Sequence, residues 1–250
     1  MQSAKPNWFE QGGDAYARYR PDYPVSLARF LADVSPSPRM AIDVGCGSGQ
    51  LTRALAERFD TVVGIDPSAD QLAHAVPHAR IQYRVAPAEQ LGGDDHRASL
   101  VTAAQAAHWF DLPRFYDEVR RVSVPGALLA LISYGVPQLD AALNSRFLAF
   151  YTDELGPYWP PERQLVDSGY VDLPFPFPER ETPTLEIRRE WDAQAFLGYL
   201  STWSATRRAH RAGKGELLAR FATDLLACWG DPDRPRTVVW PIHMRLGEVA

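Results

Sequence analysis

The chain has 250 residues, of which 46% are hydrophobic and 23% charged, the composition of an ordinary globular protein. Its formal charge is −5, whereas a nucleic-acid-binding domain normally carries an excess of Lys and Arg. No stretch reaches the 18 apolar residues of a membrane span, and the N-terminus has no signal-peptide core. We therefore expect no nucleic-acid or membrane partner, a cytoplasmic location and, with two cysteines, no metal site.

Residues 40–134 alternate short apolar runs with helical segments. After the first run, Leu51, Leu55 and Phe59 recur at helical spacing, and Pro67 with Ser68 suits the start of the next helix. The five apolar runs lack polar alternation, as is typical of strands buried on both faces; they are 40–44, 61–66, 81–85, 98–104 and 125–134. Strands that alternate with helices predict βαβ units and a parallel sheet.

After Tyr134 the pattern changes. Prolines are frequent in 156–184 and predict an irregular loop with little regular structure. Residues 185–191 alternate apolar and polar positions, which favours a strand with one exposed face. We expect helices over 192–208 and 214–229 and a last strand over 237–247, in which Pro241 favours a bulge or an edge.

A glycine-rich turn follows the first predicted strand and opens a helix. Gly45, Gly47 and Gly49 let the backbone turn tightly and let a ligand approach without meeting a Cβ. Asp66 ends the second strand, 21 residues after Gly45, where an acid can accept hydrogen bonds from ribose hydroxyls. The pattern predicts a nucleoside-binding crevice at the carboxyl ends of the strands.

The charge before this turn bears on which nucleoside binds. Asp43 stands two residues ahead of Gly45, and the glycine spacing is G-x-G-x-G rather than the dinucleotide pattern G-x-G-x-x-G. A carboxylate there would repel a pyrophosphate but would attract a ligand with an ammonium group. A nicotinamide-dependent oxidoreductase is therefore the weaker alternative.

The run D-V-G-C-G-S-G resembles the first motif of class I S-adenosylmethionine-dependent methyltransferases. The resemblance implies that Asp43 contacts the methionyl ammonium, that the glycines wrap the methionyl group and that Asp66 holds the ribose. Ala88 and Glu89 are similar to the third motif, which meets the adenine, and Gln105 opens a segment similar to the fourth. The implied cofactor-binding residues are Asp43, Gly45, Cys46, Gly47, Gly49, Asp66, Pro67, Ala88, Glu89 and Gln105.

The resemblance also implies a fold: an α/β, Rossmann-like sheet of seven mostly parallel strands, with helices on both faces and a small helical or loop cap. We expect one domain over 1–250. Its parts are N-terminal lid helices (1–36), a cofactor-binding core (37–134), a Pro-rich insertion (135–184) and C-terminal strands and helices (185–250). The K-P-G-G turn of the family is replaced here by V-P-G-A, with little consequence expected because that turn is structural.

The start of the chain resembles a narrower, small-molecule subgroup that includes trans-aconitate methyltransferase. The shared pattern is F-x5-A-Y-x2-Y-R-P-x-Y-P, from Phe9 to Pro24. It implies that Tyr19 and Arg20 close over the cofactor and that Tyr16 faces the substrate. Trp203, in G-Y-L-S-T-W-S-A, also resembles the subgroup and is expected to face the substrate, as His108 and Trp109 are from the fourth motif of the family. The alternatives left open are that the N-terminal residues only pack a helix on the sheet, that His108 and Trp109 are a packed pair, and that Trp203 is core.

These observations predict methyl transfer from S-adenosylmethionine to a small-molecule partner, at an oxygen of an organic acid or a similar metabolite. A carboxylate acceptor is ionised at neutral pH and needs no base. For a hydroxyl or amine acceptor, His108 is the candidate catalytic base. A protein that binds the cofactor without catalysis is the remaining alternative.

Overall fold

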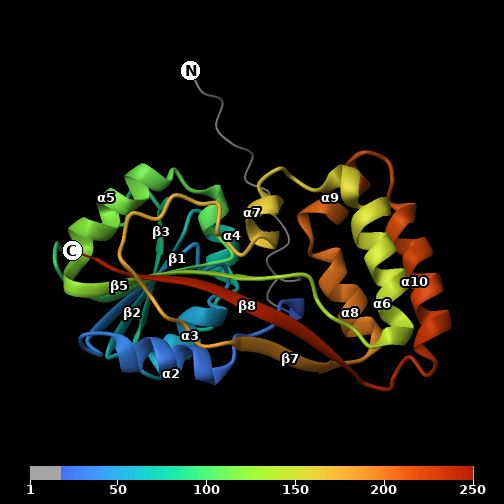
Figure 1. Ribbon diagram of the computed structural model, residues 1–250, viewed down its shortest axis with the longest axis horizontal. Coiled ribbons are helices and arrows are strands. Elements are labelled where there is room, and N and C mark those ends of the chain that lie inside the picture. The colour runs from blue at the N-terminus through green and yellow to red at the C-terminus, as the bar shows by residue number, and fades with distance from the viewer. Residues whose placement is uncertain (1–17, 250) are drawn as a thin grey trace.

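The computed structural model describes residues 18–249, and an eight-stranded sheet forms its centre (Figure 1). The strands are β1 (Met40–Val44), β2 (Thr61–Asp66), β3 (Ile81–Val85), β4 (Ala98–Ala104), β5 (Ser123–Tyr134), β6 (Glu179–Arg180), β7 (Leu185–Trp191) and β8 (Arg236–Glu248). The first five lie where the apolar runs predicted them. Tyr16 and the rest of the N-terminal pattern before residue 18 lie outside the described residues.

The strand order is β3-β2-β1-β4-β5-β8-β6, with β7 also paired to β8. Neighbours from β3 to β5 are parallel, whereas β8 is antiparallel to β5. This confirms the Rossmann-like, mostly parallel sheet. The strands number eight rather than seven because β6 and β7 pair with different stretches of β8. Pro241 pairs with Glu186 of β7 and lies directly before Ile242, where the pairing of β8 with β5 begins.

The strand order reverses at β1: β2 and β3 are added on one side of it, and the chain then crosses to β4 on the other side. The connections that leave the carboxyl ends of the parallel neighbours β1 and β4 therefore diverge, which makes a switch point of the sheet. Ligands of open α/β sheets bind in the crevice that this reversal creates. The glycine turn follows β1 and Gln105 follows β4, so the fold places both sets of predicted cofactor-binding residues at one edge.

Helices cover both faces of the sheet (Figure 1). One core cluster joins the sheet to α2 and α3 and continues into the cap; a second joins it to α5 and to residues of 166–177. Helix α5 packs on the sheet because its apolar residues form a single buried stripe, made of Leu112, Phe115, Tyr116, Val119 and Val122. The helices around the sheet are α2 (Val25–Val34), α3 (Gln50–Ala56), α4 (Ala69–Ala73) and α5 (Leu112–Val122).

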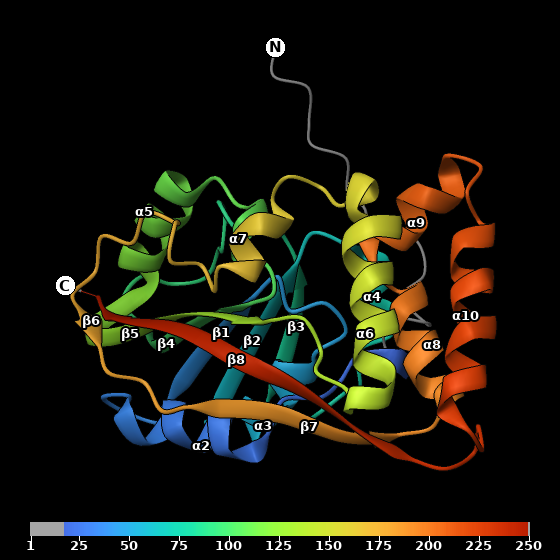
Figure 2. The same cartoon turned by 45° about the vertical axis from the view of Figure 1, so that its right-hand side comes forward.

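The cap lies beside the sheet and is built from the second half of the chain. Strands β7 and β8 run from the sheet to the cap as a long ribbon (Figure 2). The helices of the cap are α6 (Ala141–Ala149), α8 (Ala193–Ser201), α9 (Ser204–Arg211) and α10 (Glu216–Trp229). Shorter turns complete it: η2 (Phe150–Glu154), η3 (Gly156–Tyr158) and α7 (Arg163–Asp167).

Two features of the cap depart from the sequence-based expectations. Helix α6 and η2 fall in a range for which the sequence predicted only a Pro-rich insertion; α6 buries only Leu143 and Phe147, too few for a periodic signal. The single helix expected over 192–208 is two, α8 and α9, because Trp203 has an extended backbone between them. No helix among residues 18–249 has the length and apolar composition needed to cross a bilayer.

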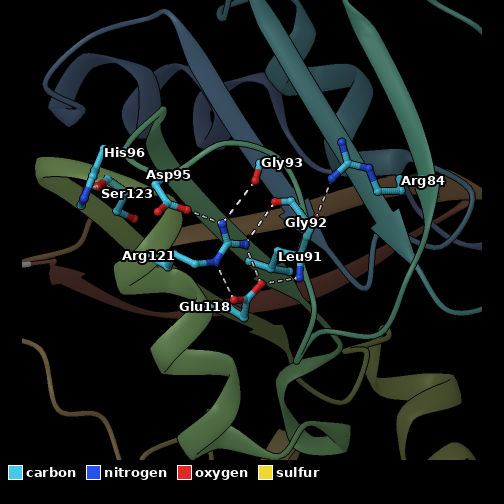
Figure 3. Close-up of polar contacts among 9 residues, drawn as sticks. All are labelled: Arg84, Leu91, Gly92, Gly93, Asp95, His96, Glu118, Arg121 and Ser123. Carbon is cyan, nitrogen blue, oxygen red and sulfur yellow. Dashed lines mark hydrogen bonds and ion pairs between the residues drawn. The ribbon is translucent and has the colours of Figure 1, made fainter.

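The loop between β3 and β4 is clamped to α5 by one arginine (Figure 3). The Arg121 guanidinium donates to Glu118, to Asp95 and to two backbone carbonyls of the loop, those of Gly92 and Gly93. Glu118 also accepts from the backbone N–H of Leu91, and its hydrogen bond with Arg121 lowers the pKa of Glu118. The clamp fixes the loop that carries Ala88 and Glu89.

Candidate active site

The turn after β1 takes a shape that only glycine adopts without strain. Gly45, Gly47 and Gly49 have φ angles of +67°, +55° and +85°, all left-handed. Space is a second constraint at Gly45, because a Cβ built there overlaps the Cβ of Ala106 and lies 3.3 Å from Cζ of Phe110. The turn therefore exposes backbone to a ligand at the carboxyl end of β1.

Asp66, at the end of β2, organises this turn. One carboxylate oxygen accepts the backbone N–H of Gly47 at 2.8 Å and the other accepts that of Ser68 at 2.8 Å. Burial raises the pKa of Asp66, while these two backbone hydrogen bonds oppose the shift. Asp66 thus joins the glycine turn to the start of α4.

Asp43 is a charge-bearing group that the fold encloses almost completely, with 1% of its surface exposed. Its two oxygens accept the hydroxyls of Thr52 and Thr102, at 2.7 and 2.8 Å. Burial raises the pKa of Asp43 to about 6, although both hydroxyl groups stabilise the carboxylate. An acid held in this way is poised to be neutralised by a cationic ligand.

A cavity opens over these groups; we call it the cofactor cavity. It brings together six residues predicted from sequence as cofactor-binding: Arg20, Asp43, Gly45, Cys46, Gly47 and Gln105. Cys46 is buried, and burial raises the pKa of its thiol well above the usual value, which suits a small residue that fills space in the turn rather than a catalytic thiol. Tyr134, from the end of β5, also lines the cavity and was not predicted.

The other predicted cofactor residues, Asp66 among them, are not in the described lining of this cavity. Gly49 is the N-cap of α3, Pro67 is exposed and Ala88 is buried. Glu89 accepts the backbone N–H of Asp111 at 2.8 Å, which ties the β3–β4 loop to the start of α5.

The two residues of the N-terminal pattern that were predicted to bind the cofactor make different contacts. Tyr19 packs over Gly198 of α8, where a Cβ would overlap its ring. Arg20 lines the cofactor cavity and donates to the hydroxyls of Thr202 and Tyr134, at 3.0 and 3.1 Å. Arg20 therefore connects the N-terminal segment with the cap and with the end of β5.

Gln105 holds an unusual backbone conformation at the end of β4. Its φ is +56°, rare for a residue other than glycine and costly unless its surroundings enforce it. Its side-chain amide donates to the backbone carbonyl of Tyr134 at 2.8 Å. Gln105 lines two cavities, the cofactor cavity and a neighbour that we call the second cavity.

The second cavity combines aromatic walls with positive charge. Three tryptophans line it, Trp109, Trp159 and Trp203, with the guanidinium groups of Arg20 and Arg163. Trp203 belongs to the hydrophobic core and also lines the cavity. It is 2% exposed and packs on Trp159, with ring centroids 5.2 Å apart. Among the described residues that line this cavity, none is a carboxylate.

His108 and Trp109 form a packed pair, as one sequence interpretation had it, and both also line the second cavity; that they face a substrate stays a prediction. Their ring centroids are 4.7 Å apart. The Nδ1 atom of His108 lies 2.8 Å from the hydroxyl of Tyr170, a buried residue that sequence reasoning missed.

Arg163 is the other residue of this cavity that sequence reasoning missed. Its Nε donates to Asp167 at 2.9 Å and to the hydroxyl of Tyr151 at 3.1 Å, and its guanidinium lies 4.8 Å from the ring centre of Trp159. These contacts hold the side chain across the wall of the cavity. No periodic pattern marked it, because it lies in the Pro-rich segment.

Comparisons with known proteins identify the family. Residues 42–131 match the family described as "Methyltransferase domain". A Dictyostelium discoideum protein named as a methyltransferase is 31% identical over 241 residues, 94% of this chain and 92% of that protein. A yeast protein (Saccharomyces cerevisiae) named as an S-adenosylmethionine-dependent methyltransferase is 30% identical over 156 residues, 57% of this chain and 54% of that protein.

A solved structure agrees with these relatives. It is described as a type II methyltransferase from Anaeromyxobacter dehalogenans and shares 47% identity with this chain, covering 92% of this chain and 98% of its own, with a TM-score of 0.85. The relatives decide against the oxidoreductase alternative and identify S-adenosylmethionine as the cofactor. The chain belongs to the class I S-adenosylmethionine-dependent methyltransferases.

Proposed function

We propose that this methyltransferase acts on a small molecule and transfers the methyl group to an oxygen of an organic acid bound in the second cavity. One observation carries the proposal: the second cavity adjoins the cofactor cavity, and Arg20 and Gln105 line both. An acceptor held among the tryptophans would therefore lie beside a cofactor held by the glycine turn. The two guanidinium groups favour an anion over a cation.

The residues of the cofactor cavity fit S-adenosylmethionine. Gly45 and Gly47 of the glycine turn line the cavity and would face the methionyl group, and the buried Asp43 would offer its ammonium a negative charge. Asp66 would accept from the ribose hydroxyls with the lone pairs that its two amide partners leave. Ala88 and Glu89 would meet the adenine.

When bound, the cofactor supplies a methyl group carried on a sulfonium. The leaving group is the neutral thioether, so no general acid is needed. The protein's own residues therefore act mainly by position. Trp109, Trp159 and Trp203 exclude water from the acceptor, and Arg163 orients an acidic group. Alignment of two reactants can contribute about 7–11 kcal/mol to lowering a barrier.

The finer resemblance to the subgroup of trans-aconitate methyltransferase supports an organic acid as acceptor. In that interpretation the N-terminal segment is a lid, and the contacts of Arg20 with Tyr134 and Thr202 hold its described end over the cavity. A small apolar-walled cavity also favours a metabolite over a nucleic acid or a membrane lipid as partner.

The test is release of S-adenosylhomocysteine from a panel of acceptors. Purified protein is incubated with S-adenosylmethionine and with carboxylic acids, phenols, alcohols and amines of similar size, and products are identified by mass spectrometry. We expect turnover with carboxylic acids and methyl ester products. Turnover confined to amines or to macromolecules would overturn the proposal.

A further inference from the structure

We infer that Tyr170 fixes His108 in the tautomer that carries its proton on Nε2, so that His108 helps to position the acceptor and is not the base of the reaction. Tyr170 is therefore a positioning residue that acts through His108. The inference rests on the proposed function for the identity of the acceptor cavity, whereas the tautomer itself depends only on the contacts around Tyr170.

The first step concerns the hydroxyl of Tyr170. The residue is fully buried, and burial raises the pKa of its hydroxyl far above the usual value, so the group stays protonated at any pH at which the protein works. A buried hydroxyl donates its proton to an acceptor rather than leave it unsatisfied. Among the described residues, the side-chain partner of this hydroxyl is Nδ1 of His108, at 2.8 Å.

The second step concerns what the hydroxyl oxygen accepts. Ala107 and His108 begin η1 (Ala107–Trp109), where backbone N–H groups have no carbonyl partner within the helix. Both backbone groups act to lower the pKa of Tyr170, against the larger effect of burial. Donors on that side of the oxygen favour directing its own hydrogen to Nδ1 of His108, its side-chain partner at 2.8 Å.

The third step concerns the imidazole. A neutral imidazole whose Nδ1 accepts a hydrogen bond carries its proton on Nε2. Neither nitrogen then has a free lone pair with which to take a proton from an acceptor.

The backbone of Tyr170 is held as firmly as its hydroxyl. Its φ is +66°, a left-handed conformation in a residue other than glycine, directly after Gly169 at +67°. Arg245 of β8 donates to the carbonyl of Tyr170 at 3.1 Å and to that of Leu173 at 2.6 Å. Strain of this kind persists where the surroundings enforce a position, and here the enforced position is that of the hydroxyl beside His108.

The consequence is a narrower class of acceptor. With no base at His108, the acceptor atom must already be deprotonated when it binds. A carboxylate meets this condition at neutral pH, whereas an alcohol or an ammonium group does not. His108 and Arg163 then serve one purpose, which is to hold an anion.

The direct test is ¹⁵N NMR of the wild-type protein labelled at its six histidines, without any substrate. The signals of His108 are assigned by their loss in His108→Gln. We expect the chemical shifts of the tautomer protonated on Nε2 in the wild type, and loss of this fixed pattern in Tyr170→Phe. Tyr116→Phe is the control, because it removes another buried hydroxyl, which donates to the carbonyl of Pro174. A wild-type ring protonated on Nδ1 would overturn the inference, even if Tyr170→Phe fails to fold.

A kinetic test uses whichever acceptor the panel identifies, at saturating S-adenosylmethionine. Glutamine keeps a donor near the position of Nε2 but cannot act as a base, so His108→Gln should lose about tenfold in kcat/KM and keep the shape of the wild-type pH profile. Removal of a true base costs about 10²–10⁴-fold and also removes an inflection near pH 6.5; that result would contradict the inference. If no acid is turned over, the proposed function fails and the NMR result still decides the tautomer.

Discussion

The two halves of the described chain build their parts of the site by different means. Residues 40–134 hold the cofactor cavity mainly by backbone geometry: strand ends, three left-handed glycines and one left-handed glutamine. Residues 135–249 supply Trp159, Arg163 and Trp203 to the second cavity, from short turns and from the break between two helices. The first half thus forms its cavity largely from backbone, and the second half contributes side chains from short, irregular elements.

The largest expected effect is in the backbone of the first half. Gly45→Ala must place a Cβ against Ala106 at a φ of +67°, and left-handed strain with overpacking together cost about 4 kcal/mol. We expect the turn to leave its wild-type shape in order to relieve this strain, and the affinity for S-adenosylhomocysteine to fall by up to about 1000-fold by calorimetry, the factor to which 4 kcal/mol corresponds. Gly213→Ala is the control, because φ is +75° there with nothing within 4 Å of the new Cβ. Equal affinities in the two variants would remove the proposed role of the turn.

The same contrast explains how far the sequence could predict the structure. The strands of the first half are buried on both faces, so each left an unbroken apolar run, and the glycines and acids at their ends could be located by position alone. Tyr134 could have been found in the same way, because it ends the fifth strand. Thr52 and Thr102 could not, since only the folded structure places both hydroxyls on Asp43.

The second half left weaker signals for a physical reason. Arg163 and Tyr170 lie on a five-residue helix and in the turn that follows it, elements too short to show a period. Their place at the cavity depends on long-range contacts, those of Arg163 with Tyr151 and of Arg245 with the carbonyl of Tyr170. No sequence pattern indicates such pairings, so Arg163 and Tyr170 could be found only from the structure.

The second prediction concerns charge in the first half. Asp43→Asn removes the carboxylate that would face the methionyl ammonium, and a hydrogen bond to a charged group contributes about 1.5–3 kcal/mol. We therefore expect the affinity for S-adenosylhomocysteine to fall about 50-fold at pH 7.5 by calorimetry. Asp94→Asn is the control, since the side chain of Asp94 is 81% exposed and its removal should leave the affinity unchanged.

The same variant should be more stable than the wild type without cofactor. Burial raises the pKa of Asp43 from 3.8 to about 6, so the folded protein binds this proton more tightly than the unfolded chain. As pH rises from about 4 to about 6, ionisation of Asp43 lowers the free energy of unfolding, by up to about 3 kcal/mol. The Tm of Asp43→Asn should exceed that of the wild type at pH 7.5 and approach it at pH 4. Wild-type cofactor affinity should weaken as pH falls through about 6; an affinity independent of pH would contradict this role.

The smallest expected effect concerns the second half and separates the two cavities. Arg163→Met removes a guanidinium that lines only the second cavity and keeps a long apolar side chain against Trp159. The KM of the acceptor should rise about tenfold, in line with the loss of one charge-assisted hydrogen bond that is partly screened by solvent, while the affinity for S-adenosylhomocysteine stays at the wild-type value. The control is Arg220→Met, because Arg220 is an exposed arginine of the cap; it should change neither the KM of the acceptor nor the affinity for S-adenosylhomocysteine. A fall in cofactor affinity as large as the rise in KM would contradict this division of the two ligands between the halves of the chain. Arg163, which lines the second cavity and not the cofactor cavity, would then contribute to the binding of both the acceptor and the cofactor.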